Sequence, residues 1–427
     1  MTKKPRFQAP TGMHDILPEE QKYFQKIYQI VEEIADFYNF QKIETPILEE
    51  TELFSRGIGL ATDVVQKEMF SLRTKGGDNL SLRPEGTASV VRAYLEHGMI
   101  NLPQPVKLWY LGPFFRYEHP QAGRYRQFWQ FGFEVFGEGN PIIDVQIIQI
   151  FYNILKELKL KNLIIQVNSI GDGFCRPYYK KLLVSYLKSR AGSLCADCRR
   201  RLRENPLRIL DCKEEKCQRI VSQAPQIVDH LCENCHKHFK EILEFLDELE
   251  LPYRLNSYLV RGLDYYTKTV FEIIEENEKG KVLGTLAGGG RYDNLVKIVG
   301  NRDVPAVGAA GGIDRIINLM KEKTVKFSKE VKPQVFLAQL GNLAKRKSLK
   351  LMEECRKLRV PIAESIGRDS LKSQLKIADR VGVKYALILG QKEALEGIMI
   401  IRDMASGKQK IVKLDKAVTE IKKMLSK

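Results

Sequence analysis

Apolar residues near the N-terminus recur at helical spacing and predict an amphipathic helix. Pro18, Glu19 and Glu20 form a helix-start signal, since proline is tolerated in the first turn of a helix and acidic residues are favoured there. The apolar residues that follow every three or four positions are Ile27, Ile30, Val31, Ile34, Phe37 and Tyr38. Residues 40–47 then predict a strand. Its Pro46 must lie at an edge or an end, because proline has no N–H to donate to a sheet.

Two aromatic-rich runs further along the chain predict an antiparallel hairpin. Residues 114–115 and 128–136 flank the turn sequence Pro-Gln-Ala-Gly at positions 120–123. Before the hairpin, residues 80–87 predict a strand that runs into a Pro-Glu-Gly turn and a helix. After it, residues 142–158 have a helical period and predict a further helix. The first part of the chain therefore mixes helices with strands.

Strands and helices alternate from residue 335 onwards. The predicted strands cover residues 335–340, 361–364, 385–389 and 397–402, and the predicted helices cover residues 344–358 and 370–382. The segment before them, residues 321–332, is polar and lysine-rich and has the composition of a linker. We therefore expect one domain over residues 1–325 and a small mixed α/β domain over residues 331–427.

The charge distribution points to a class of partner. The chain has 427 residues, a formal net charge of +16 and an isoelectric point near 9.3. Residues 331–427 contain 22 Lys and Arg against 10 Asp and Glu, so +12 of that charge lies in the smaller domain. Cationic surface gains free energy by releasing counterions from a phosphate backbone, so we expect this domain to contact a polyanion. A basic surface that only favours solubility is the alternative.

The sequence contains no apolar run that approaches the length of a membrane span. Its first residues also lack the apolar segment of a signal peptide. We therefore expect a cytoplasmic protein that makes no contact with a membrane.

Closely spaced cysteines fall within residues 174–252. The pairs are Cys195-x2-Cys198, Cys212-x4-Cys217 and Cys232-x2-Cys235. Because a cytosolic chain rarely uses cysteines for disulfides, and each CxxC pair offers two thiolates to one tetrahedral ion, we expect a structural Zn²⁺ there. The four ligands that the spacing favours are Cys195, Cys198, Cys232 and Cys235. Three alternatives remain open for Cys212 and Cys217: they are supplementary ligands, they replace one of the CxxC pairs, or they are plain buried cysteines.

The predicted hairpin carries charge where a half-buried sheet would avoid it. Gln130 and Glu134 lie on one face, because side chains alternate along a strand, and Arg116, Arg124 and Arg126 border the turn. Arginines beside a carboxylate on a rigid sheet suit a substrate with both a phosphate and a cationic or hydrogen-bond-donating group. A solvated hairpin with salt bridges is the alternative.

This hairpin resembles motif 2 of the class II aminoacyl-tRNA synthetases, in its histidyl form, and the resemblance extends over nearly the whole chain. The helix and proline-bearing strand at the N-terminus are similar to motif 1, and residues 304–315 are similar to motif 3. RGLDYYTKTVFE at residues 261–272 and LAGGGRYDNL at residues 286–295 match two histidyl signatures. Ala309 and Asp314 depart from motif 3, where the family has a larger aromatic residue and a glutamate.

The resemblance implies an α+β fold with an antiparallel-sheet catalytic domain. A helical, cysteine-rich insertion would occupy about residues 174–252, and residues 331–427 would form an α/β anticodon-binding domain. ATP binding would follow this class II scheme, since the sequence contains neither GxxxxGK[ST] nor GxGxxG.

The activity that the resemblance implies is ATP-dependent formation of histidyl-adenylate from L-histidine, then transfer to the 3′ end of tRNA(His), by a homodimer that uses ATP with Mg²⁺. Arg116 and Arg261 would be catalytic, and both would bind ATP together with Arg315. The implied histidine-binding residues are Glu85, Gly86, Thr87, Gln130, Glu134, Tyr265, Tyr266 and Tyr292. Gln121, Arg124 and Arg126 would meet the tRNA acceptor end.

Two readings compete with this one. Without the resemblance, Thr87 is a helix cap and Glu85 a solvated neighbour. Within the family, a catalytically inactive paralogue regulates ATP phosphoribosyltransferase. That paralogue usually lacks the anticodon-binding domain and loses the RGLDYYT segment, whereas this chain retains both.

Overall fold

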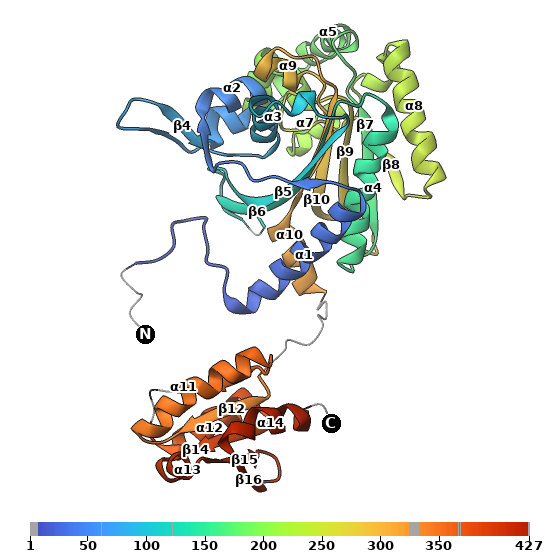
Figure 1. Ribbon diagram of the computed structural model, residues 1–427. Coiled ribbons are helices and arrows are strands. Elements are labelled where there is room, and N and C mark those ends of the chain that lie inside the picture. The colour runs from blue at the N-terminus through green and yellow to red at the C-terminus, as the bar shows by residue number, and fades with distance from the viewer. Residues whose placement is uncertain are drawn as a thin grey trace. The chain divides into compact units, whose positions relative to one another are not determined.

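The computed structural model describes residues 7–60, 62–121, 123–323, 333–365, 367 and 369–425. Its contacts divide the chain into two compact units, Met1–Val325 and Lys326–Lys427, shown in blue to yellow and in orange to red in Figure 1. From residue 324 onwards, the predicted linker at residues 321–332 lies outside the described part of the chain.

The first unit is built on an eight-stranded sheet of order β1-β5-β6-β11-β10-β9-β7-β8. Its strands are β1 (Gln41–Lys42), β5 (Val106–Phe115), β6 (Gln127–Phe136), β7 (Leu163–Ser169), β8 (Tyr253–Leu255), β9 (Thr267–Glu276), β10 (Val282–Arg291) and β11 (Ala306–Gly312). The strands from β5 to β7 pair antiparallel, and only the edge strands β1 and β8 pair parallel with their neighbours. The predicted hairpin is present as β5 and β6, which pair from Val106–Phe136 to Phe115–Gln127.

Helices cover this sheet, and four more form an insertion between β7 and β8 (Figure 1). The covering helices are α1 (Pro18–Phe37), α2 (Thr51–Ile58), α3 (Thr87–Glu96), α4 (Pro141–Glu157), α9 (Leu295–Gly300) and α10 (Ile313–Glu322). The helices of the insertion are α5 (Cys175–Lys188), α6 (Ala196–Glu204), α7 (Glu215–Val221) and α8 (Glu233–Glu248). The predicted helical insertion is therefore present. A separate three-stranded sheet contains β2 (Leu48–Glu50), β3 (Ser71–Arg73) and β4 (Asn79–Leu82).

The N-terminal elements differ in detail from the prediction. Helix α1 buries Ile27, Ile30, Val31 and Ile34 as expected, but Phe37 is 80 % exposed because the helix ends at this residue. The strand expected over residues 40–47 is reduced to the two residues of β1, and Pro46 lies between β1 and β2. A proline cannot donate to a ladder, so pairing stops before it.

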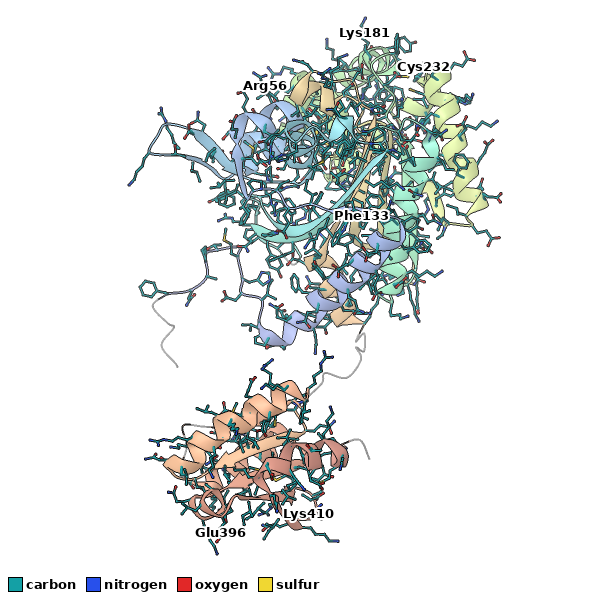
Figure 2. All side chains as sticks on the ribbon, in the orientation of Figure 1. Arg56, Phe133, Lys181, Cys232, Glu396 and Lys410 are labelled. Carbon is teal, nitrogen blue, oxygen red and sulfur yellow. The ribbon has the colours of Figure 1, made fainter. Side chains whose placement is uncertain are left out.

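A buried ion pair joins the sheet to α4. Arg291, at the end of β10, has a fully buried side chain, and its Nε lies 3.1 Å from Asp144 Oδ2, whose side chain is 1 % exposed. Arg291 Nη1 also donates to the carbonyl of Glu138 at 3.0 Å and to Asp293 at 3.2 Å. The guanidinium is thus hydrogen-bonded on several sides, as a buried charge must be. Phe133 of β6 lies in the same interior with no exposed surface (Figure 2).

The second unit is a mixed five-stranded sheet of order β13-β12-β14-β15-β16 with helices on both faces. Its elements are β12 (Val335–Gln339), α11 (Asn342–Lys357), β13 (Ile362–Glu364), α12 (Leu371–Val381), β14 (Tyr385–Leu389), α13 (Gln391–Glu396), β15 (Ile398–Asp403), β16 (Gln409–Lys413) and α14 (Ala417–Leu425). The Ser370 side chain caps α12, and Gly382 ends it with φ = 77°, a left-handed conformation that favours glycine. In the part of the chain that the structure describes, no helix is both long and apolar enough to cross a membrane.

We predict that Asp144→Ala lowers the free energy of unfolding of the first unit by about 3–5 kcal/mol, because it removes the closest carboxylate from a buried guanidinium and leaves the Nε of Arg291 without its acceptor. Urea unfolding followed by tryptophan fluorescence measures this unit alone, since the two tryptophans, Trp109 and Trp129, both lie in it. Glu215→Ala, which removes an exposed ion pair to Arg219, is the control and should change little. Equal transitions for both variants would contradict the prediction.

Candidate active site

Three arginines from distant parts of the sequence line one cavity of about 290 Å³. Arg116 follows β5, Arg261 precedes β9, and Arg315 lies in the first turn of α10. Gln130 of β6 lines the same cavity. The structure therefore brings together the three arginines that the sequence singled out, at the centre of the sheet where β6, β10 and β11 meet. Three guanidinium groups around one space suit a polyanionic ligand such as a triphosphate.

Arg261 is held in place by an acidic partner. Its Nη1 forms an ion pair with Glu272 of β9, and the Thr285 hydroxyl donates to the other oxygen of Glu272 at 2.9 Å. Gly288 of β10 provides the space for the guanidinium, because a Cβ at this position would lie 2.5 Å from Arg261 Nη1. The guanidinium is thus oriented before any ligand arrives, which is how a preorganised electrostatic contact is built.

The other two arginines are fixed by backbone carbonyls. Arg116 Nε donates to the carbonyl of Pro84 at 2.9 Å, and its guanidinium lies 5.6 Å from the centre of the Phe128 ring. Arg315 Nε donates to the carbonyl of Gly123 at 3.3 Å, and its Nη1 donates to that of Thr285 at 3.1 Å. Arg315 therefore ties the hairpin loop to the rim of the cavity.

Acidic side chains to which the sequence analysis assigned no role in the site also line this cavity. They are Glu118, Asp211, Glu272 and Asp314. Asp314, the departure from motif 3, accepts a hydrogen bond from the backbone N–H of Trp129 at 2.7 Å. Carboxylate oxygens next to a phosphate site are the ligands that Mg²⁺ prefers, so the donor set fits a magnesium–nucleotide complex.

Behind the arginines, Glu134 of β6 sits fully buried among hydroxyl groups. The Thr87 hydroxyl donates to its Oε1 at 2.8 Å, Tyr110 lies 3.4 Å from the same oxygen, and the Tyr292 hydroxyl donates to Oε2 at 2.5 Å. Burial raises the pKa of Glu134 to about 8, although the hydrogen bonds from Tyr292 and Thr87 oppose that rise. Gly308 of β11 is paired with Glu134 of β6, and a side chain at this position would collide with the carboxylate.

Glu85 forms the second buried carboxylate of this cluster. Its oxygens accept the backbone N–H groups of Thr87 and Ala88, both at 2.8 Å, and the Tyr265 hydroxyl lies 3.3 Å away. Thr87 does not cap α3, since its hydroxyl points to Glu134, and Glu85 takes the N-terminal N–H groups instead. The alternative of a solvated Glu85 beside a Thr87 cap is therefore wrong. Burial raises the pKa of Glu85.

Paired tyrosines connect this buried cluster to the arginine cavity. The rings of Tyr265 and Tyr266 are 4.6 Å apart, and Tyr265 lies 5.7 Å from Tyr292. The Arg261 guanidinium lies 5.9 Å from the centre of the Tyr266 ring. Burial raises the pKa of Tyr265 and Tyr292 well above the usual value, so both hydroxyls remain hydrogen-bond donors at neutral pH. The arrangement offers carboxylates and hydroxyls next to the three arginines of the cavity.

Tyr110 is the member of this cluster that sequence reasoning missed. It stands opposite Gly132 in the hairpin, and a Cβ at Gly132 or Gly86 would overlap its ring. The signal was available in principle, because a large ring next to a glycine on a paired strand fills the space that the glycine leaves.

The three residues expected at the tRNA acceptor end lie in the loop between β5 and β6, where Gln121 and Arg124 form an isolated bridge. Arg124 is about half exposed and lies 3.7 Å from Glu118. Arg126 is less free, because its guanidinium stacks 3.7 Å from the centre of the Tyr117 ring and its Nε donates to the carbonyl of Glu118 at 3.3 Å.

The structure corrects the expected zinc ligand set. Cys195 and Cys198 lie with Cys212 and Cys217, whereas Cys232 and Cys235 lie in a second group with two residues that the sequence analysis overlooked, Asp172 and Cys175. The four predicted ligands therefore do not form one site. The spacing of the CxxC pairs could not show which pairs meet, because the path of α5 to α8 decides it.

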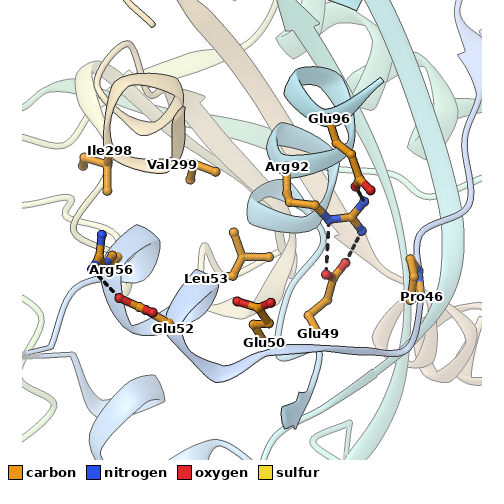
Figure 3. Close-up of a pocket in the computed structure, with 10 residues that line it drawn as sticks. All are labelled: Pro46, Glu49, Glu50, Glu52, Leu53, Arg56, Arg92, Glu96, Ile298 and Val299. Carbon is orange, nitrogen blue, oxygen red and sulfur yellow. Dashed lines mark hydrogen bonds and ion pairs between the residues drawn. The ribbon is translucent and has the colours of Figure 1, made fainter. Parts of the chain in front are cut away.

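A larger cavity, of about 720 Å³, lies elsewhere in the first unit (Figure 3). Its arginines are already paired, Arg92 with Glu49 and Glu96, and Arg56 with Glu52 (Figure 3). With Glu50, four carboxylates line the cavity against two arginines. This acidic lining would repel a nucleotide, so size alone does not identify the ligand site.

The antiparallel sheet and the arginine-lined cavity define the catalytic domain of a class II aminoacyl-tRNA synthetase. The family model described as "Histidyl-tRNA synthetase" matches residues 12–316, and the model described as "Anticodon binding domain" matches residues 334–424. The chain belongs to the histidyl-tRNA synthetase family.

Similar proteins cover nearly the whole chain. A histidine–tRNA ligase of Acetivibrio thermocellus is 43% identical over 97% of this chain and 99% of its own length. One of Dehalococcoides mccartyi is 43% identical over 98% of this chain and 100% of its own length. The crystal structure of apo S. aureus histidyl-tRNA synthetase has a TM-score of 0.79 and 34% identity, and the match covers 97% of this chain and 99% of that one.

We predict that Glu134→Gln makes the stability of the ligand-free protein less dependent on pH. The folded protein keeps a proton on Glu134 that the unfolded chain releases above its ordinary pKa, so this contribution to stability declines above pH 4.5 and is lost as the pH rises through about 8. Thermal midpoints measured from about pH 6 to about pH 9 should fall more steeply in the wild type than in Glu134→Gln. Glu157→Gln, an exposed residue of α4, should follow the wild type, and parallel curves for all three proteins would refute the prediction.

Proposed function

We propose that this protein is a histidine–tRNA ligase that activates L-histidine with ATP and transfers it to the 3′ end of tRNA(His). The observation that carries the proposal is the position of Arg261, which lines the arginine cavity and also contacts Tyr266 of the buried carboxylate and hydroxyl cluster. One guanidinium thus stands between a phosphate site and a pocket suited to an amino acid. The family and the near-full-length relatives support the same reaction.

Activation is an in-line attack of the histidine carboxylate on the α-phosphorus of ATP, with pyrophosphate as the leaving group. Negative charge builds on the non-bridging α-oxygens, and we assign their stabilisation to Arg116 and Arg261, which need transfer no proton. Arg315 would hold the γ-phosphate side of the nucleotide. Mg²⁺, held with the phosphates by cavity carboxylates such as Glu118, would neutralise further phosphate charge.

Histidine would occupy the pocket formed by the buried cluster. Glu85, with Gly86 and Thr87, would bind the α-amino group, since a carboxylate facing an ammonium is a strong charge-assisted contact. Glu134 and Tyr266 would hold the two imidazole nitrogens, and Gln130, Tyr265 and Tyr292 would complete the pocket. An amino acid whose side chain lacks a hydrogen-bonding group at the position of either imidazole nitrogen would leave a buried polar group of the pocket unpaired and would be rejected.

Transfer to tRNA requires a base to take the proton of the terminal ribose hydroxyl. We assign this role to the phosphate of the adenylate, because no histidine is among the described lining residues of the cavity and its lysine, Lys213, is paired with Asp211 at 2.8 Å. Arg124, with Gln121 and Arg126, would meet the acceptor end. The second unit, which carries most of the net charge, would act as the anticodon-binding domain.

Two further features complete the proposal. We propose a homodimer, supported by exposed apolar residues such as Ile47 and Leu48, which lie next to the proline of the motif 1 segment. We place the protein in the cytoplasm, where charged tRNA is used for translation. Structural Zn²⁺ bound by cysteines of the insertion is also part of the proposal.

Histidine-dependent exchange of labelled pyrophosphate into ATP tests the function. We predict exchange with histidine and not with other amino acids, and a loss of about 10²- to 10³-fold in Arg261→Ala, because the variant loses one preorganised contact to the developing charge. Arg219→Ala is the matched control, since this arginine is exposed on α7 and pairs only with Glu215.

A protein that binds histidine yet shows no exchange with any amino acid would overturn the enzyme proposal in favour of the regulatory paralogue. Full exchange in Arg261→Ala would remove the role assigned to that residue while leaving the activity itself in place.

A further inference from the structure

We propose that the helical insertion holds two zinc ions at separate sites, one bound by Cys195, Cys198, Cys212 and Cys217 and the other by Asp172, Cys175, Cys232 and Cys235. In each group, one ligand atom per residue lies within 4.8 Å of the ligand atoms of all the others. We call the first the four-cysteine site and the second the aspartate site. The family membership alone assigns neither of them.

The four-cysteine site has the dimensions of a zinc tetrahedron. A Zn–S bond of about 2.3 Å places two thiolates on a tetrahedron about 3.8 Å apart, and Cys195 Sγ lies 3.9 Å from Cys212 Sγ. A disulfide would require about 2.05 Å, and all these cysteines are free. The geometry therefore matches sulfur atoms that share one ion rather than a bond.

Backbone N–H groups already point at the sulfur atoms of this site. Cys198 N donates to Cys195 Sγ at 3.4 Å, and Cys195 N donates to Cys217 Sγ at 3.3 Å. Hydrogen bonds from the backbone to metal-binding thiolates orient the sulfur atoms and stabilise their charge. They follow from the fold of the knuckle, in which Cys195 is the N-cap of α6.

The aspartate site joins the beginning of the insertion to the beginning of its last helix. Asp172 lies between β7 and α5 and Cys175 is the first residue of α5, whereas Cys232 and Cys235 stand at the start of α8, as the label of Cys232 shows in Figure 2. The backbone N–H of Cys232 donates to Cys175 Sγ at 3.0 Å, across 57 residues. An ion there would tie the start of α5 to the start of α8.

Asp172 can serve as a ligand while it also caps α5. Its Oδ1 accepts the backbone N–H groups of Phe174 at 2.9 Å and Cys175 at 3.3 Å, which leaves Oδ2 for a metal. Carboxylate oxygen is an accepted fourth ligand beside three thiolates. The spacing Asp172-x2-Cys175 repeats that of the two CxxC pairs, so the site is again made of two knuckles.

Ordinary burial of apolar thiols explains these clusters less well. Cys355 shows that ordinary case, since it is fully buried in the second unit and belongs to neither group. Nearby histidines are not ligands, because His238 instead faces Asp144, with Nε2 4.0 Å from Oδ2. Two independent groups of four ligands are what two structural ions require.

The four-cysteine site borders the arginine cavity, and this consequence rests on the proposed function. Asp211 and Lys213 flank Cys212 in the sequence, and both line the cavity with Arg261. Zinc at Cys212 would therefore fix one wall of the nucleotide site. We expect its loss to weaken the use of ATP more than the binding of histidine.

Zinc content of the purified full-length protein, measured by mass spectrometry of the metal per chain, tests the two sites independently of activity. We expect about two zinc ions in the wild type, about one in Cys212→Ser/Cys217→Ser and about one in Cys175→Ser/Cys232→Ser. Cys355→Ser is the matched control and should keep both ions. No zinc in the wild type would overturn the proposal. Two zinc ions retained in either double variant would overturn the site removed in that variant.

Replacement of zinc by Co²⁺ in the wild type gives a second measurement that does not depend on the folding of a variant. Absorption of a tetrahedral cobalt–thiolate centre, with two components for the two ligand sets, would support the proposal. The absorption of hexahydrated cobalt only would overturn it.

In pyrophosphate exchange, the Cys212→Ser/Cys217→Ser variant should show a KM for ATP raised several-fold with the KM for histidine unchanged. An unchanged KM for ATP would overturn the positioning of the cavity wall and leave the metal result standing.

Discussion

The burial of the Glu134 carboxylate inside the sheet is the constraint on which the composition of the neighbouring strands depends. A carboxyl group at this depth is tolerated only when its oxygens are hydrogen-bonded, and Thr87, Tyr110 and Tyr292 provide these contacts. Position 308 requires glycine, because any side chain there would overlap the carboxylate of Glu134. Glycine is a poor strand former, so the eight-stranded ladder has to compensate for the glycine-rich stretches of β10 and β11.

The same reasoning explains why the arginines are accompanied by acids and carbonyls. An arginine aimed into an empty cavity would be mobile or would repel its neighbours. Glu272 holds Arg261, and the carbonyls of Pro84 and Gly123 hold Arg116 and Arg315. These contacts satisfy part of each guanidinium and leave the rest for a ligand. Because these contacts already order the three arginine side chains in the free protein, ligand binding does not have to pay the entropy of ordering them.

Sequence reasoning predicted the elements with strong local signals and missed what depends on long-range contacts. The β5–β6 hairpin and the helix from Ser370 to Gly382 were predictable because turn residues and caps mark their limits. The extent of β5 back to Val106 and the place of Tyr110 were not, since both depend on the partner strand. The three arginines were named from motifs, whereas their acidic partners required the fold.

The cysteines show in the same way that local spacing does not predict long-range contacts. Local spacing identified the knuckles, but a tetrahedral site takes two knuckles and several pairings satisfy the spacing equally well. The helical path of the insertion selects one pairing, and it adds Asp172 and Cys175, which no paired cysteine motif contains.

The insertion and the active site are mechanically connected through two aspartates. Asp63, in the segment after α2, receives Arg201 at 2.7 Å, with Arg200 at 3.7 Å and Arg208 at 3.9 Å. Asp264, three residues after Arg261, accepts a hydrogen bond from Asn205 Nδ2 at 2.8 Å. Arginines of α6 that resemble a free nucleic-acid-binding face are therefore partly used to fasten the insertion to the catalytic unit. Because Asp264 belongs to the segment that positions Tyr265 and Tyr266, a disturbance of the insertion reaches this pair of tyrosines through that hydrogen bond. It also reaches them through Arg176 of α5, whose Nη2 donates to the carbonyl of Tyr266.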